Sequence, residues 1–180
     1  IVRAQHDWEE ANITSVTAAA GEMLGAARFA VYGKQTYPDA TSTLRLSYGT
    51  VRGYPMNGTR APALTTFHGL YDRALAFELE PPFALTERFL QRQEALDLAT
   101  PLNFVSTCDI IGGNSGSPVV DTEGRLVGLV FDGNIESLVG RFVYDETANR
   151  AVSVHAAAIA LALRDLYDGG HLVREMTPGP

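Results

Sequence analysis

The sequence predicts a mostly β domain flanked by helices, and three stretches of its 180 residues carry this prediction. Ala-rich helix formers run from about residue 13 to 33, a strand–turn–strand pattern covers Pro118 to Phe131, and an Ala/Leu-rich stretch covers Val152 to Leu166. Apolar residues at helical spacing indicate helices, and short apolar runs bounded by turn residues indicate strands. We expect three regions: the end of a helical domain (1–36), a β-domain (37–150), and a carboxy-terminal helix with its tail (151–180).

The first elements follow from local signals. Asn12 suits the N-cap of the first helix, and Gly33 suits its end, because glycine tolerates the backbone turn that stops a helix. Thr43–Tyr48 alternates polar and apolar residues, which predicts a half-buried strand, and Val51–Tyr54 continues after Gly49. Strands and loops are therefore expected from about residue 41 onward.

The middle of the chain is expected to be less regular. Phe67–Phe89 contains Pro81-Pro82, and consecutive prolines prevent regular structure there. Glu87–Leu96 has the composition of a short helix. The apolar stretch Val152–Leu166 stops before Gly169-Gly170, which predicts a terminal helix that ends there.

The segment Gly112–Pro118, Gly-Gly-Asn-Ser-Gly-Ser-Pro, is the strongest functional signal. Ser115 lies between glycines, which tolerate positive φ and carry no Cβ, so the backbone can turn tightly and approach a ligand closely. A serine nucleophile needs such a turn, because its Oγ must project while neighbouring backbone N–H groups converge on the oxyanion. The alternative is a polar turn between two strands, since short Gly/Ser/Asn runs commonly form turns.

A predicted hairpin follows this segment. Pro118–Val120 indicates a short strand, Asp121–Gly124 a turn, and Arg125–Phe131 the returning strand, which Asp132-Gly133-Asn134 then breaks. The loop, the hairpin and the returning strand follow one another directly along the chain. This order favours the nucleophile over an isolated turn.

Five spaced motifs resemble a known family. Gly-Asn-Ser-Gly-Ser-Pro resembles the Gly-Asp-Ser-Gly-Gly-Pro nucleophile loop of chymotrypsin-like serine peptidases. The five segments occur in family order: Tyr37–Gly49, Thr66–Arg73, Pro101–Thr107, Gly112–Pro118 and Phe131–Asn134. Together they look like the carboxy-terminal part of the bacterial dipeptidyl-peptidase 7/11 family of serine exopeptidases.

The resemblance implies a fold and an activity. Members are much longer than this chain, and they have a chymotrypsin-like double β-barrel with an added helical domain. Residues 37–150 would form the second, carboxy-terminal barrel, and the chain would be a fragment whose partner is the amino-terminal half of the same protein. Members remove dipeptides from peptides with a free amino end, in the periplasm or at the cell surface. A homodimer of the full-length enzyme is compatible with this expectation.

The resemblance also assigns site residues. Ser115 is the expected nucleophile, and the N–H groups of Gly113 and Ser115 form the expected oxyanion hole. Asp132 would pair with the substrate ammonium within the substrate-binding segment Asp132-Gly133-Asn134, although Asp-Gly is also common in ordinary turns. Family members that select Asp or Glu carry Arg at the position of Gly133. Glycine there implies hydrophobic or broad preference at the residue before the cut.

The general base is expected to lie outside the chain. In the family, the catalytic His and Asp belong to the first barrel, and none of the four histidines here lies in a matching motif: His6, His68, His155 and His171. His155, at the terminal helix, is expected on its surface or capping nearby backbone. A serine without a base is a weak nucleophile at neutral pH, so we expect the isolated chain to be inactive.

Composition excludes several other classes. A net charge of −7 argues against a nucleic-acid partner, which a basic face would attract, and no apolar run reaches the length of a membrane span. Cys108 is the only cysteine, which excludes an internal disulfide. The predicted chemistry needs no cofactor and no metal. The alternative function is a non-catalytic peptide-binding or assembly domain derived from a serine peptidase. A third and least favoured function is that of a self-sufficient endopeptidase that uses His68 or His155 as its base.

Overall fold

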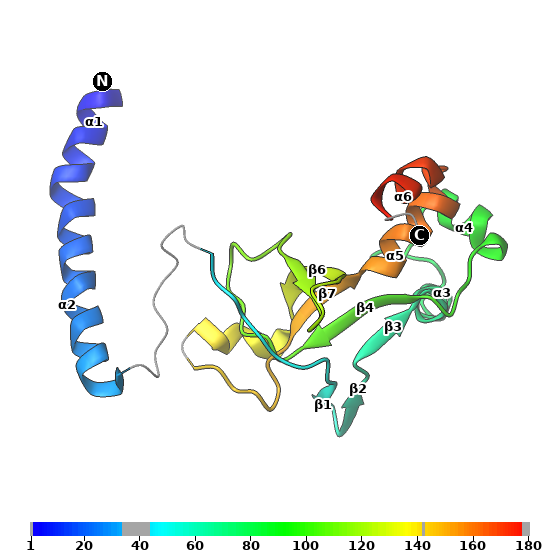
Figure 1. The fold of residues 1–180 in the computed structure, drawn as a ribbon, viewed down its shortest axis with the longest axis horizontal. Coiled ribbons are helices and arrows are strands. Elements are labelled where there is room, and N and C mark those ends of the chain that lie inside the picture. Colours follow the sequence, from blue (N-terminus) through cyan, green and yellow to red (C-terminus); the bar gives the residue numbers. More distant parts are fainter. Residues whose placement is uncertain (1, 34–43, 142, 178–180) are drawn as a thin grey trace. The chain divides into compact units, whose positions relative to one another are not determined.

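The computed structural model describes residues 2–33, 44–141 and 143–177, which divide into the units Ile1–Arg45 and Leu46–Pro180 (Figure 1). The first unit is a helical run made of α1 (Val2–Glu9), the π-helical segment η1 (Glu10–Thr14) and α2 (Ser15–Tyr32). None of the residues in these three elements is buried.

The first helix ends where expected but begins earlier. Gly33 follows α2 with a φ of +59° and its N–H donates to the carbonyl of Phe29, so the predicted stop is confirmed. The expectation for Asn12 is wrong, since this residue lies inside the helical run and its side chain donates to the carbonyl of Trp8 (2.8 Å). Residues 2–11 are mostly good helix formers, and they extend the helix past the polar residue that resembled a cap.

The second unit contains an antiparallel sheet with the strand order β3-β4-β7-β6-β5. Its strands are β3 (Leu64–Thr66), β4 (Pro101–Ser106), β5 (Pro118–Val120), β6 (Leu126–Gly133) and β7 (Ala151–His155). A separate two-stranded hairpin is formed by β1 (Tyr54–Met56) and β2 (Thr59–Ala61). The sheet is open, with β3 and β5 at its edges, so the described residues form no closed barrel.

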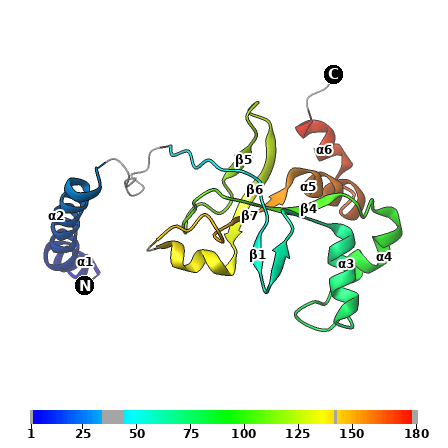
Figure 2. The same cartoon turned by 90° about the horizontal axis from the view of Figure 1, so that it is seen from below.

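Helices gather at one end of this sheet, and the 3₁₀ helix η4 (Ile135–Arg141) lies at the other (Figure 2). The gathered elements are α3 (Phe67–Ala76), α4 (Glu87–Arg92), η3 (Gln93–Ala95), α5 (Ala156–Leu161), η5 (Ala162–Leu166) and α6 (Gly170–Met176). Buried side chains of these helices, together with Leu96 directly after η3, form the main apolar cluster: Phe67, Tyr71, Leu96, Ala158, Leu161 and Leu166. We call this region the apolar end.

Three expectations about secondary structure need correction. The strand predicted for Thr43–Tyr48 is absent from residues 44–48, and Thr43 lies outside the described residues. Phe67–Ala76 is a helix, because Phe67, Leu70, Tyr71 and Ala74 share one apolar face and the prolines come only after its end.

The terminal helix starts at Ala156 rather than at Val152. Residues 151–155 pair as β7 with both β4 and β6, because their β-branched and small side chains suit the centre of the sheet. The short helix predicted at Glu87–Leu96 is found as α4 and η3, and the hairpin from Pro118 is confirmed as β5 and β6.

Candidate active site

The turn predicted to carry the nucleophile connects β4 to β5. Gly113 and Gly116 adopt positive φ values of +102° and +86°, which L side chains rarely adopt, so glycine is required at both positions. Asn114 closes the turn, since its side-chain Oδ1 accepts from the N–H of Ile111 (2.9 Å) and its own N–H donates to the carbonyl of Ile111 (3.1 Å). Ser115 is exposed at the apex between the two glycines.

Backbone amides of this turn divide into two groups. Those of Asn114, Gly116 and Ser117 donate to carbonyls of the turn or of β6, including Gly116 N–H to Val130 O at 2.7 Å. Those of Gly112, Gly113 and Ser115 donate to no group within the part of the chain that the structure describes. Two of these three amides, Gly113 and Ser115, are the pair expected for the oxyanion hole, whose role stays a prediction.

The hydroxyl of Ser115 donates to the carbonyl of Phe131 at 3.1 Å, so it is linked to β6. Within the described residues, it makes no hydrogen bond to a histidine. His155 is engaged elsewhere, because its Nδ1 accepts from the N–H of Ala157 (3.0 Å) and its ring meets Phe104 edge-on. Burial lowers the pKa of His155, which favours this neutral acceptor form, and the expectation that it caps nearby backbone is confirmed.

His68 lies on α3, which belongs to the apolar end, and His6 and His171 lie on α1 and α6. All three side chains are exposed. Within the described part of the second unit, none of His68, His155 and His171 is hydrogen-bonded to Ser115, whose hydroxyl donates to Phe131.

Asp132 lies at a β-bulge. Val130 pairs with Ser153 and Asp132 with Val152, so Phe131 is the extra residue of β6 at this point. Bulges redirect side chains and are common beside active sites. Asp132 is exposed, and its Oδ1 accepts from the N–H of Gly133 (2.8 Å). Its predicted contact with a substrate amine stays a prediction.

Gly133 lies against Ser137, and its predicted place beside the substrate stays a prediction. A Cβ at this position would lie 2.2 Å from the Oγ of Ser137 and 3.2 Å from its Cβ. The hydroxyl of Ser137 donates to the carbonyl of Asn134 (2.6 Å), so a side chain at 133 would displace a bonded group. Any substitution here must therefore be considered together with Ser137.

Asn134 is buried and has an evident structural function. Its Oδ1 accepts from the N–H of Arg150 (2.9 Å), and its Nδ2 donates to the carbonyl of Ala148 (2.8 Å). Its own N–H donates to the carbonyl of Arg150 (2.9 Å). The assignment of Asn134 to substrate binding stays a prediction, whereas its role in joining β6 to the segment before β7 is visible.

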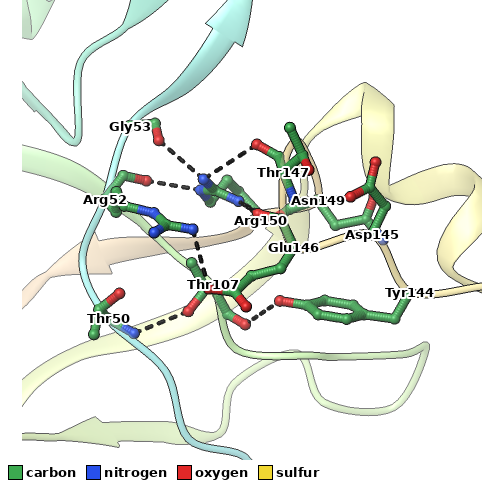
Figure 3. A network of polar contacts seen from close by, with 10 residues as sticks. All are labelled: Thr50, Arg52, Gly53, Thr107, Tyr144, Asp145, Glu146, Thr147, Asn149 and Arg150. Atoms are coloured by element: carbon green, nitrogen blue, oxygen red, sulfur yellow. Dashed lines mark hydrogen bonds and ion pairs between the residues drawn. The ribbon is translucent and has the colours of Figure 1, made fainter.

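Arg150 is the centre of a polar network that the sequence did not reveal (Figure 3). Its side chain is buried and donates five hydrogen bonds to backbone carbonyls, those of Arg52, Gly53, Glu146, Thr147 and Asn149. A guanidinium has five N–H donors, so these bonds use its full capacity. Burial lowers the pKa of Arg150, with the nearby charge of Arg52 acting in the same direction.

The same network reaches the start of the nucleophile turn. The hydroxyl of Tyr144 donates to the carbonyl of Thr107, and Thr107 exchanges two hydrogen bonds with Thr50 (3.0 Å each). The burial of Arg150 is the one feature that would have indicated this network, and burial cannot be read from a single sequence.

No group of three or more His, Cys, Asp or Glu side chains suited to a metal ion occurs among the described residues. No helix among those same residues is long and apolar enough to cross a membrane.

The Peptidase S46 profile matches residues 2–178, nearly the whole chain. Dipeptidyl-peptidase 7 of Capnocytophaga gingivalis is 34% identical over 153 residues, which are 78% of this chain and 21% of the relative. The Asp/Glu-specific dipeptidyl-peptidase of the same species is 34% identical over 149 residues, again 78% of this chain and 21% of the relative. Crystal structures of Porphyromonas endodontalis DPP11 are also similar, and the complex with the dipeptide Arg-Glu has a TM-score of 0.73 at 28% identity, covering 86% of this chain and 23% of that one.

The open sheet with its glycine-flanked serine therefore belongs to a peptidase fold. The chain is a member of the Peptidase S46 family, which confirms the resemblance inferred from its five motifs. It spans about a fifth of the length of the curated relatives it matches.

Proposed function

We propose that the protein containing this chain is a serine-type dipeptidyl-peptidase that releases dipeptides from the amino end of peptides, with Ser115 as its nucleophile. The observation that carries the proposal is the division of amides in the turn. Ser115 is exposed at the apex, and the N–H groups of Gly113 and Ser115 are left without partners within the described residues, while those of Asn114, Gly116 and Ser117 are bonded. An oxyanion hole needs free backbone donors of this kind beside the nucleophile.

The chemistry follows from this arrangement. The Oγ of Ser115 attacks the carbonyl carbon of the second peptide residue, and its proton passes to a base in another part of the polypeptide. The tetrahedral oxyanion accepts hydrogen bonds from the amides of Gly113 and Ser115. The shortened peptide leaves with the proton, and water then hydrolyses the ester on Ser115 to release the dipeptide.

Asp132 supplies the feature that distinguishes an exopeptidase from an endopeptidase. Its exposed carboxylate lies one residue after Phe131, to whose carbonyl Ser115 is bonded. A carboxylate at a set separation from the nucleophile pairs with the substrate ammonium and so selects a free amino end. Peptides with a free amino end are therefore the proposed substrates.

For selectivity, we propose hydrophobic or broad preference at the residue before the cut. Gly133 carries no charge, so a substrate carboxylate would find no arginine there. Overall identity does not separate the two possibilities, because relatives named dipeptidyl-peptidase 7 and Asp/Glu-specific dipeptidyl-peptidase are each 34% identical to this chain. The solved DPP11 complexes contain Arg-Asp and Arg-Glu, which makes acidic preference the competing outcome.

The test compares Ser115→Ala with Ser117→Ala in the full-length protein. Ser115→Ala should abolish dipeptide release and leave the fold intact, because it removes one small exposed hydroxyl. Ser117→Ala is the matched control and should retain most activity. If Ser115→Ala and Ser117→Ala both keep their activity, Ser115 is not the nucleophile. A parent protein that binds peptides without cleaving them would support the non-catalytic alternative.

The proposed location is the periplasm or the cell surface, where such an enzyme meets extracellular peptides. Cell fractionation with detection of the full-length protein tests this location directly. Recovery in the cytosolic fraction would contradict it.

A further inference from the structure

The proposed amine-binding residue lies where β6 pairs irregularly with β7, since Asp132 pairs with Val152 directly after a shift in register. Asp132 follows the bulge at Phe131, and a bulge leaves its extra residue outside the regular ladder. The direction of the Asp132 side chain therefore depends on how the chain is held on both sides of the bulge.

The side before the bulge is fastened to the nucleophile turn. Ser115 donates through its hydroxyl to the carbonyl of Phe131 (3.1 Å), and Gly116 donates through its N–H to the carbonyl of Val130 (2.7 Å). Val130 returns a hydrogen bond to the carbonyl of Ser117 (3.1 Å). Movement of this side relative to Ser115 would break three hydrogen bonds.

The side after the bulge is fastened to the segment Tyr144–Arg150, which we call the brace. Asn134 makes three hydrogen bonds to it, two with the backbone of Arg150 and one with the carbonyl of Ala148. The side chain of Arg150 then holds the brace in shape by binding three of its own carbonyls: Glu146, Thr147 and Asn149.

The brace also reaches the start of the nucleophile turn by two routes. Tyr144 donates through its hydroxyl to the carbonyl of Thr107. Arg150 donates to the carbonyls of Arg52 (2.8 Å) and Gly53 (2.9 Å). The segment that holds these two residues is bonded to the chain leading into the turn, through Arg52 N–H to Val105 O (3.2 Å). Figure 3 shows the carbonyls of Arg52 and Gly53 directed at the guanidinium, and the bond from Tyr144 to Thr107 apart from it.

From this geometry we infer that Arg150 is a positioning residue that sets the separation between Ser115 and Asp132, and thereby the preference for a free amino end. The inference rests on the proposed function. Arginine suits this task better than lysine, because its planar fork reaches five acceptors in set directions and an ammonium has three donors.

The test uses Arg150→Lys in the full-length enzyme, with Arg52→Met as the matched control. Arg52→Met removes an exposed arginine and its ion pair with Glu146 but keeps the backbone carbonyl that Arg150 binds. We expect Arg150→Lys to raise the KM of a dipeptidyl substrate at least tenfold with kcat reduced less than threefold. Arg52→Met should stay within twofold of the parent in both parameters.

Two further readouts separate positioning from simple loss of folded protein. A small fluorophosphonate probe, which has no amino group to bind, should label Ser115 in Arg150→Lys within twofold of the parent rate. The parent should prefer the free-amine substrate strongly over its N-acetylated form, and Arg150→Lys should reduce that ratio at least fivefold. Unfolding alone would lower every rate together and leave the ratio unchanged.

If Arg150→Lys does not fold, Tyr144→Phe carries the test, because it removes a single hydroxyl from the other tie of the brace. It should reduce the same ratio at least twofold. The inference would be overturned if the folded variants kept the parent's preference for the free-amine substrate over its N-acetylated form. It would also be overturned if probe labelling and substrate hydrolysis fell by the same factor. Failure of the proposed function would look different, since the parent itself would then release no dipeptide or acquire no label at Ser115.

Discussion

The two ends of the second unit are stabilised by different kinds of contact. At the apolar end, α3, α5 and η5 bury Phe67, Tyr71, Leu161 and Leu166 against one another. At the other end, several buried residues are polar, and they include Ser106, Thr107, Asn134, Asn149 and Arg150. We call this second region the polar end.

This difference indicates that the apolar end mainly stabilises the fold, whereas the polar end mainly holds side chains in defined positions. Apolar burial is non-directional and scales with area, so it stabilises a fold without defining exact positions. Hydrogen bonds weaken steeply when bent, so a network of them holds groups in defined directions. The candidate site lies at the polar end, where direction matters most. Variants at the apolar end should therefore change stability, and variants at the polar end should change catalysis.

The largest expected effect is at the apolar end. Phe67 is 2% exposed in the apolar cluster, so Phe67→Ala should lower the free energy of unfolding by about 3–5 kcal/mol. The folded fraction should keep the parental kcat/KM. Urea unfolding of the full-length enzyme with parallel kinetics measures both quantities. Leu75→Ala on the same helix is the control, since Leu75 is exposed and should change stability by about 0.5 kcal/mol or less.

The reverse pattern is expected for Asp132→Asn. Asparagine keeps the acceptor for the N–H of Gly133 but loses the charge that pairs with an ammonium. We expect kcat/KM for free-amine substrates to fall roughly thirtyfold, which corresponds to a loss of about 2 kcal/mol in transition-state stabilisation. The midpoint of urea unfolding should stay unchanged. Asp72→Asn, at an exposed position of α3, is the control. If Asp132→Asn keeps the kcat/KM of the parent, the carboxylate of Asp132 does not bind the substrate.

Selectivity sharpens the comparison further. Gly133→Arg alone should lower activity on all substrates, because a Cβ there collides with the Oγ of Ser137. Ser137→Gly removes that side chain, so the double variant should prefer Asp or Glu over Leu or Met at the substrate residue before the cut. The ratio of kcat/KM between the two kinds of substrate should change by a factor that corresponds to at most about 2 kcal/mol. Ratios of kcat/KM across four dipeptidyl substrates measure the shift. A parent that already prefers acidic residues would refute the proposed hydrophobic or broad preference.

The smallest expected effect concerns pH. The N–H of Thr147 donates to the carboxylate of Asp145 (2.9 Å) and holds the pKa of Asp145 below its usual value. A carboxyl whose pKa is depressed by folding adds stability above its unfolded pKa of about 3.9, and this stability is lost as pH falls through the lower, folded value.

Asp145→Asn should therefore weaken the acid dependence of unfolding slightly. The difference between variant and parent should shrink as pH falls from 6 to below about 3. Urea titrations at several pH values measure it, and a difference that is constant across that range would refute the assignment.

Local chemistry explains which parts of this structure could be predicted. The β5–β6 hairpin was predictable because Asp121 and Gly124 form its turn from neighbouring residues, with Asp121 accepting from Arg125 and Gly124 at a φ of +79°. The glycine-flanked serine was predictable for the same reason. The Arg150 network was not, since its partners Arg52 and Gly53 lie almost 100 positions away in the chain.

The contact between Gly133 and Ser137 was not predictable either, because it depends on how η4 folds back towards β6. A single sequence gives no signal for such a contact.

The central claim is that Ser115 is the nucleophile, and covalent labelling tests it most directly. The full-length enzyme is treated with a fluorophosphonate probe, digested, and examined by mass spectrometry for the modified residue. We predict one adduct per active site, located on Ser115, that forms in step with the loss of dipeptide release. An adduct on another residue that accounts for the lost activity, or full inhibition with Ser115 unmodified, would contradict the account.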